Sequence, residues 1–263
     1  MKIAYGSDLH LELGIAEPEL DSIRGADILI LAGDIYKGRN EISGRPKIME
    51  YSQQCIKELA IPVIVVCGNH ELYGEEAYRF WNDCQNFSAA TQNLHFLENE
   101  TLILNGHRFL GCTLWSDFQM MGNPEPAMEL AQQIIYDYKR VKLAEPNGEM
   151  RDLVPDDTRK WNANSRQFLE KSLAESFDGQ TVVVSHFPPV PMIAPEFAES
   201  PLTPYFNNNW ADDITNGILT PDIWISGHTH HMEEKSLGTT RIRSRQGGYP
   251  GELGPFKWGV VET

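Results

Sequence analysis

The chain has 263 residues, of which 41% are hydrophobic and 22% are charged, so it is long enough to fold around a substantial core. Its formal net charge of −15 disfavours extended contact with a nucleic-acid backbone or an anionic membrane surface. Its longest apolar runs are far shorter than a membrane span requires.

The cysteines and the N-terminus predict a cytoplasmic protein. None of Cys55, Cys67, Cys84 and Cys112 belongs to a C-x-x-C pair, and Cys67 and Cys112 lie in strand-like runs where buried free thiols are usual. The chain begins Met1-Lys2-Ile3 and enters a strand directly, without the pattern of a secretion signal. These features indicate a reducing compartment.

The first two predicted strands end in the same way. Residues 2–7 lead into Asp8-Leu9-His10, and residues 27–32 lead into Gly33-Asp34. Along an extended chain, positions i and i+2 point to the same side, so we expect Asp8 and His10 to converge while Leu9 enters the core. A carboxylate beside an imidazole suits a divalent first-row metal. The alternative is an aspartate that serves a turn beside an exposed histidine.

The third strand repeats this layout. Residues 62–67 form an apolar run that stops at Gly68, which permits a sharp turn, and Asn69-His70-Glu71 follows. A helix predicted over 45–60 precedes this strand, and strand–helix–strand at this spacing predicts parallel strands with a right-handed crossover. In such sheets, polar ligands gather beyond the carboxyl ends of the strands.

The middle of the chain changes from parallel units to a hairpin and then to helices. Asn105-Gly106 between apolar runs is a strong hairpin signal. The predicted elements are a helix over 75–84, strands over 94–97, 101–104 and 108–112, and helices over 128–141 and 158–176, with a polar link over 145–157. We expect residues 115–180 to be a mainly helical layer packed on the sheet; the alternative is that its loops form a lid.

The last third adds two strand ends that carry histidine. Residues 181–185 end at His186, which two prolines follow closely, and residues 221–226 end at Gly227-His228-Thr229-His230. The spacing of His228 and His230 repeats the i, i+2 argument. The remaining predicted segments are a long loop over 190–216 and closing strands over 239–244 and 257–261.

Polar side chains at these strand ends form one candidate site. They are Asp8, His10, Asp34, Asn69, His70, His186, His228 and His230. Even with His70 left aside, three carboxylate or amide oxygens and four imidazoles exceed the capacity of one tetrahedral ion and suit two ions that share a carboxylate. Nitrogen and oxygen donors without thiolate favour Mn, Fe, Zn, Co or Ni over Ca or Mg.

The motifs in this order resemble those of the calcineurin-like metallophosphoesterase superfamily. They are Asp8-x-His10, Gly33-Asp34, Gly68-Asn69-His70-Glu71, His186 and Gly227-His228-x-His230. The resemblance implies one domain over residues 1–263, built as a four-layer α/β/β/α sandwich of two mixed β-sheets flanked by helices. It also implies a ligand assignment. Asp8, His10 and His230 would hold one metal, Asn69, His186 and His228 the other, and Asp34 would bridge them. His70 would act on the substrate.

The expected function is a dinuclear metal-dependent phosphoesterase that hydrolyses a phosphodiester or phosphomonoester of a small organic phosphate. Two divalent ions roughly 3.5–4 Å apart can clamp a phosphate and lower the pKa of a shared water, and the resulting bridging hydroxide attacks phosphorus. His70 can protonate the leaving alkoxide or bind a non-bridging oxygen.

One departure from the superfamily pattern argues against a protein phosphatase. Protein Ser/Thr phosphatases of this superfamily carry an Asp and an Arg shortly after the bridging Asp, whereas Gly33-Asp34-Ile35-Tyr36 is followed here by Lys37-Gly38-Arg39. This spacing leaves His70 without its usual carboxylate partner. Glu71 is a poor substitute, because neighbouring side chains diverge.

Two other functions are considered. A non-catalytic scaffold of the same fold would be free to lose ligands, and this chain has lost none that we identify. A nuclease of the superfamily is disfavoured by the acidic net charge of the chain. A basic patch does follow the last motif, formed by Lys235, Arg241, Arg243 and Arg245. These side chains could bind a phosphate; the alternative interpretation is that they are the solvated side chains of an edge strand. The expected partner is a small phosphorylated substrate. We expect no binding to membranes, and binding to nucleic acid is disfavoured.

Overall fold

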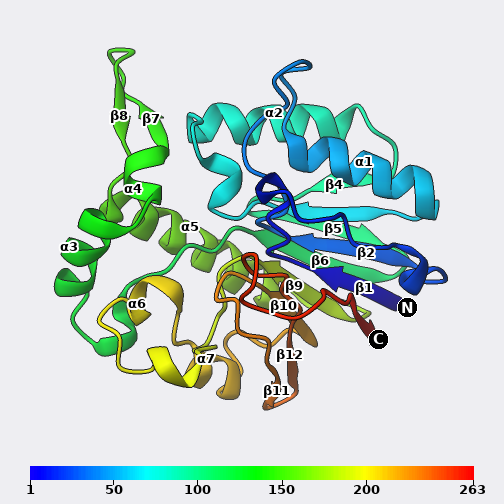
Figure 1. Cartoon of the computed structure of the whole chain (residues 1–263). Coiled ribbons are helices and arrows are strands. Elements are labelled where there is room, and N and C mark those ends of the chain that lie inside the picture. Colours follow the sequence, from blue (N-terminus) through cyan, green and yellow to red (C-terminus); the bar gives the residue numbers. More distant parts are fainter.

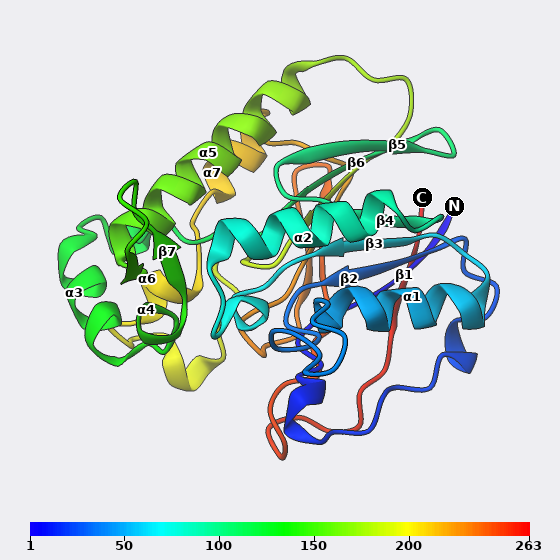
Figure 2. The same ribbon diagram turned by 90° about the horizontal axis from the view of Figure 1, so that it is seen from above.

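Two β-sheets face each other in the computed structural model, which describes residues 1–263. One sheet has the strand order β13-β1-β2-β3-β4, and the other has the order β11-β12-β10-β9-β6-β5. Helices α1 and α2 cover the outer face of the first sheet, while α5 and α7 pack on the second (Figure 1 and Figure 2). The predicted four-layer sandwich of two mixed sheets is confirmed.

The bounds of the elements are as follows. The strands are β1 (Lys2–Gly6), β2 (Ile28–Ala32), β3 (Val63–Val66), β4 (Leu94–Phe96), β5 (Glu100–Leu104), β6 (His107–Cys112), β7 (Lys142–Ala144), β8 (Met150–Asp152), β9 (Thr181–Ser185), β10 (Ile223–Ser226), β11 (Glu234–Leu237), β12 (Thr240–Ser244) and β13 (Gly259–Glu262). The helices are α1 (Lys47–Leu59), α2 (Ala77–Ala89), α3 (Glu125–Ile134), α4 (Asp137–Arg140), α5 (Pro155–Ala174), α6 (Thr203–Phe206) and α7 (Ala211–Thr215). None of them combines the length and apolar character needed to cross a bilayer.

The central strands are apolar on both faces because each sheet is covered on both sides. In β9, Val182 and Val184 belong to the core between the two sheets, together with Phe109 of β6. Val183 faces the other way and joins a separate core that includes Leu169 of α5. This alternation accounts for the continuous apolar runs in the sequence.

The strand order brings the polar motifs to one edge. Strands β1, β2 and β3 are parallel neighbours in one sheet, and β9 and β10 are parallel neighbours in the other. The sheets are joined at this edge, because Nδ1 of His186, just after β9, lies 2.9 Å from the carbonyl oxygen of Ala32 at the end of β2. The chain ends meet elsewhere, where β13 pairs antiparallel with β1 (Figure 1).

Three local predictions in the second half are wrong. The helix expected over 128–141 is two helices, α3 and α4, because the backbone is extended at Ile135. The polar link expected over 145–157 holds most of the β7–β8 hairpin, which projects from the body in Figure 1. The loop expected over 190–216 contains α6 and α7. Short elements of this kind depend on tertiary contacts more than on periodicity.

Candidate metal centre

The polar residues that follow β1 and β10 lie in left-handed backbone, not in extended strands. The φ angles are 54° at Asp8, 44° at His10, 76° at His228 and 51° at His230. The extended-chain argument for both i, i+2 pairs is therefore wrong. Positive φ is uncommon for such residues and persists only where the surroundings hold it, most often at functional sites.

One group of possible ligands gathers after β1 and β10. The ligand atoms of Asp8, His10 and His230 all lie within 4.8 Å of one another. Nε2 of His230 is 3.1 Å from Nε2 of His10 and 3.5 Å from Oδ1 of Asp8. The backbone N–H of His228 donates to both Asp8 oxygens at 3.0 Å, which links this carboxylate to the other sheet.

A second group gathers after β2, β9 and β10. The ligand atoms of Asp34, His186 and His228 also lie within 4.8 Å of one another. Oδ2 of Asp34 is 3.4 Å from Nε2 of His186 and 3.9 Å from Nε2 of His10, so this oxygen borders both groups. The Asn69 side-chain oxygen lies 3.2 Å from Nε2 of His186.

The donor set fits metal ions. Nε2 of His228 is buried and has no hydrogen-bond partner. Burial lowers the pKa of His228 well below its usual value, and the neighbouring His186 lowers it further. The His228 ring is therefore neutral, and the lone pair on Nε2 is available to a metal. A buried nitrogen without a partner costs free energy, and a metal ion would satisfy it.

The rings of His186 and His230 carry protons that balance the carboxylates. Burial disfavours the charged form of His186, but Asp34 outweighs this and raises the pKa of His186 to about 10. Burial is likewise outweighed at His230, where contacts with Asp8 and Glu252 raise the pKa to about 9. Burial opposes ionisation of Asp34 as well, yet the nearby histidines hold the pKa of Asp34 well below its usual range.

Glu71 anchors the loops that carry Asp34 and Asn69. Its fully buried carboxylate accepts four backbone N–H groups. They belong to Asp34 (2.9 Å), Ile35 (2.8 Å), Tyr36 (3.1 Å) and Gly68 (2.7 Å). Burial and the nearby Asp34 raise the pKa of Glu71 to about 7 although these donors oppose the rise. The Glu71 carboxylate therefore points toward the backbone of the two loops, which agrees with the expectation that Glu71 is not the carboxylate partner of His70.

Two glycines allow the loops to approach so closely. A Cβ atom on Gly68 would overlap the Asp34 carboxylate, and one on Gly33 would lie 2.5 Å from Nδ1 of His186. Gly33 also has a φ of 87°, where a side chain would be strained.

Comparison with known proteins identifies the family. A model of the calcineurin-like phosphoesterase family matches residues 1–232. The chain belongs to this family. Its members are metal-dependent phosphoesterases, so the chain is a hydrolase whose family implies divalent metal ions. The resemblance found in the sequence motifs is confirmed.

Individual proteins are similar to this chain over most of its length. An uncharacterized protein of Acanthamoeba polyphaga mimivirus is 27% identical over 280 residues, which span 97% of this chain and 93% of that protein. The solved structure of phosphopantetheinyl hydrolase from Mycobacterium tuberculosis has a TM-score of 0.65 at 16% identity, covering 99% of this chain and 95% of that one. A dimetal phosphatase from Danio rerio has a TM-score of 0.53 at 15% identity, with coverage of 94% and 87%. At these identities, the solved structures show the shared phosphoesterase fold alone.

Asp137 lies behind Asn69 and was missed in the sequence. Oδ1 of Asp137 accepts hydrogen bonds from the Asn69 amide (3.0 Å) and the Tyr73 hydroxyl (2.6 Å), and Oδ2 accepts one from Tyr205. Because the amide nitrogen of Asn69 is held by Asp137, its oxygen is the atom that faces His186. Asp137 begins α4 just after the helix break, and no local pattern pointed to it.

Glu12 is the carboxylate nearest to the His70 ring. Its Oε1 lies 3.6 Å from Nδ1 of His70 and 3.5 Å from Nδ1 of His10. Burial opposes ionisation of Glu12, but its contacts with these two rings lower its pKa to about 2. Glu12 lies in a short 3₁₀ helix over Leu11–Leu13, and no local pattern in the sequence pointed to it.

Tyr249 and Glu252 reach the centre from the segment after β12 and were also missed. The Tyr249 hydroxyl lies 3.1 Å from Nε2 of His70, and its ring centroid is 4.6 Å from those of both His10 and His230. Oε2 of Glu252 lies 2.6 Å from Nδ1 of His230 and accepts the backbone N–H of Tyr249 at 2.9 Å. This segment follows the last recognised motif, and nothing in the sequence analysis pointed to it.

Replacing Glu71 tests its anchoring role. In Glu71→Gln, an amide N–H₂ faces backbone N–H groups, so buried donors lose their acceptor. We expect a loss of roughly 2–4 kcal/mol of unfolding free energy and weaker Mn²⁺ binding. Urea unfolding with and without Mn²⁺ measures both. The control is Glu41→Gln at an exposed site; equal behaviour of the two variants would show that Glu71 anchors nothing.

The raised pKa values of His186 and His230 predict proton release when metal binds. Both rings are protonated at pH 7 without metal, whereas a metal needs the free nitrogen, so binding should displace about two protons and weaken as pH falls. Calorimetric titration of Mn²⁺ in buffers of different ionisation enthalpy counts the protons. Binding at pH 7 without proton release would exclude these two rings as ligands.

Proposed function

We propose that this protein is a dinuclear metal-dependent phosphoesterase that hydrolyses a small organic phosphodiester or phosphomonoester. The observation that carries the proposal is the position of Oδ2 of Asp34, which borders both groups of possible ligands. A carboxylate in this position suits a bridge between two ions. The name of one structural neighbour, a dimetal phosphatase, agrees with this proposal.

The proposed ligands divide between the two groups. Asp8, His10 and His230 would hold one ion, Asn69, His186 and His228 the other, and Asp34 would be shared. Mn, Fe, Zn, Co and Ni all suit these nitrogen and oxygen donors. When bound, such ions supply charge that draws the phosphate oxygens and lowers the pKa of a water.

His70 is the proposed acid. Its backbone N–H donates to Oδ1 of Asp34 at 2.9 Å, and its Nε2 lies 4.0 Å from Oδ2 of the same residue. Burial lowers the pKa of the ring, but Asp34 and Glu12 outweigh this and raise it, which favours the protonated ring that an acid requires. With Glu12 on the Nδ1 side, Nε2, which the Tyr249 hydroxyl also contacts, is the nitrogen that would donate a proton to the leaving alkoxide.

Two further features support a small substrate in a reducing compartment. Three of the four basic side chains that suggested a nuclease are paired with a carboxylate: Lys235 lies 3.2 Å from Glu233, and Arg245 and Arg243 lie 2.9 Å and 3.9 Å from Glu234. The fourth, Arg241, donates to the carbonyl oxygen of Glu262 at 2.9 Å. Paired cations offer little free charge to a phosphate backbone. All four cysteines are buried and free, which agrees with a cytoplasmic protein.

The direct test is turnover of synthetic esters. Protein loaded with Mn²⁺ should hydrolyse bis-p-nitrophenyl phosphate or p-nitrophenyl phosphate, and chelation should abolish release of nitrophenolate because the ions carry the chemistry. A non-catalytic scaffold of the same fold would bind the metal but release no nitrophenolate. Failure with both esters in protein shown to hold two ions per chain would contradict the proposal.

Substitutions of His70 and Glu12 test the acid. His70→Asn should lower kcat roughly 10²–10⁴-fold, as loss of a general acid does. Glu12→Gln should lower it roughly 10- to 100-fold, as loss of a supporting carboxylate does. The loss should be smaller for p-nitrophenyl esters, whose leaving group needs no proton, than for alkyl esters. Equal losses on both kinds of ester would assign His70 to binding.

A further inference from the structure

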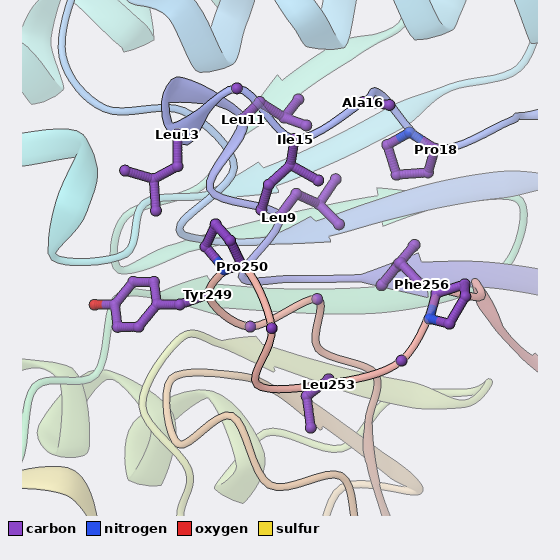
Figure 3. A pocket seen from close by; sticks show the side chains of 16 residues that line it. Leu9, Leu11, Leu13, Ile15, Ala16, Pro18, Tyr249, Pro250, Leu253 and Phe256 are labelled. Carbon is purple, nitrogen blue, oxygen red and sulfur yellow. The ribbon is translucent and has the colours of Figure 1, made fainter.

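An apolar groove of about 530 Å³ runs beside the metal centre (Figure 3). It lies between the segments 9–18 and 247–256. Figure 3 shows Leu11, Leu13 and Ile15 on one of the two lining segments and Pro250, Leu253 and Phe256 on the other. None of the sixteen lining residues is charged, in a chain where 22% of the residues are charged. Ligand sites are typically concave and apolar with a few polar groups at one end.

The groove adjoins the metal centre through Tyr249. Leu9 and Leu11, which line it, flank the proposed ligand His10 in the sequence. Tyr249 lines it too, and its hydroxyl reaches to 3.1 Å from Nε2 of His70. That hydroxyl is the one polar side-chain group among the lining residues, and it lies where the groove meets the proposed acid.

The wall formed by 247–256 is tied to the site. The N–H groups of Gly247 and Gly248 donate to the carbonyl oxygens of Ser7 (3.0 Å) and Asp8 (2.9 Å). The Glu252 carboxylate faces His230 and does not line the groove. The acidic side chain of this segment is therefore directed to the metal centre, while its apolar side chains face the groove.

We propose that this groove binds the uncharged, apolar organic part of the phosphate ester while the phosphate occupies the metal centre. The inference rests on the proposed function and narrows its substrate to esters of an aliphatic or aromatic alcohol. Nucleotides and sugar phosphates fit poorly, because their hydroxyls and charges would lose water in the groove and find only the Tyr249 hydroxyl as a side-chain partner.

The magnitude follows from burial of methylene groups. Complete removal of one methylene from water strengthens binding about fourfold. The groove is open along one side, since the Leu13 side chain is 49% exposed, so each methylene stays partly hydrated. We therefore expect roughly two- to threefold per methylene until the groove is filled.

A series of alkylphosphonates tests this without turnover. Methyl-, butyl-, hexyl- and octylphosphonate are titrated into Mn²⁺-loaded protein by calorimetry, and each dissociation constant is measured. The expected result is a steady gain with chain length, with octylphosphonate at least tenfold tighter than butylphosphonate. Kinetics with nitrophenyl alkyl phosphodiesters should show the same trend in KM.

A variant and a matched control locate the effect. Leu13→Glu places a carboxylate on the wall at a half-exposed position, and it should abolish the dependence on chain length. Ile103→Glu introduces the same charge on β5, where the side chain is 63% exposed and outside the groove, and it should retain the dependence. Metal content, measured for both variants, confirms that they are folded.

Three results would overturn the inference. If the wild-type protein binds methylphosphonate but its dissociation constants do not change with alkyl chain length, the inference is overturned and the phosphoesterase proposal stands. Absence of both phosphonate binding and ester hydrolysis would overturn both proposals. A wild-type dimer that Leu13→Glu converts to a monomer, with a flat series, would show that a second copy of the chain covers this groove.

Discussion

The arrangement of the centre depends on one buried carboxylate. Glu71 accepts four N–H groups from the loops that follow β2 and β3, and each of its oxygens takes two of them. Asp34 belongs to one of these loops, and Asn69 and His70 to the other. A loop without regular structure leaves its N–H groups unsatisfied, and buried ones are costly. Glu71 satisfies them and thereby holds two loops in contact.

The same side chains that are proposed to bind metals also join the two sheets. His186, after β9, contacts the carbonyl oxygen of Ala32 at the end of β2, and Asp8, after β1, accepts the N–H of His228 after β10. Asp8, His10, Asp34, His186 and His228 are buried, and His230 is partly exposed. Without metal, the negative charges of the carboxylates are balanced by the protonated rings of His186 and His230. Two metal cations would replace the protons on these rings. Fold and site are therefore stabilised by one network.

Much of this centre could be predicted because its parts follow strand ends. Parallel strands bring their carboxyl ends to one edge, so Asp34 and His186 could be placed together without knowledge of any contact. Asp8 and His10 do lie together, but not because the chain is extended there, as the sequence analysis proposed. Both residues adopt positive φ, which the sequence does not reveal. The ligand roles themselves stay predictions. Asp137 and Tyr249 could not be found, because each acts on a residue far away in the chain and lies outside any recognised motif.

The account stands on the claim that Asp34 is shared by two metal ions. The most direct measurement is a crystal structure of Mn²⁺-loaded protein with anomalous data collected at the manganese edge. We expect two anomalous peaks, one against Asp8, His10 and His230 and one against Asn69, His186 and His228, with the Asp34 carboxylate between them. A single peak, or two peaks of which only one contacts Asp34, would contradict the account.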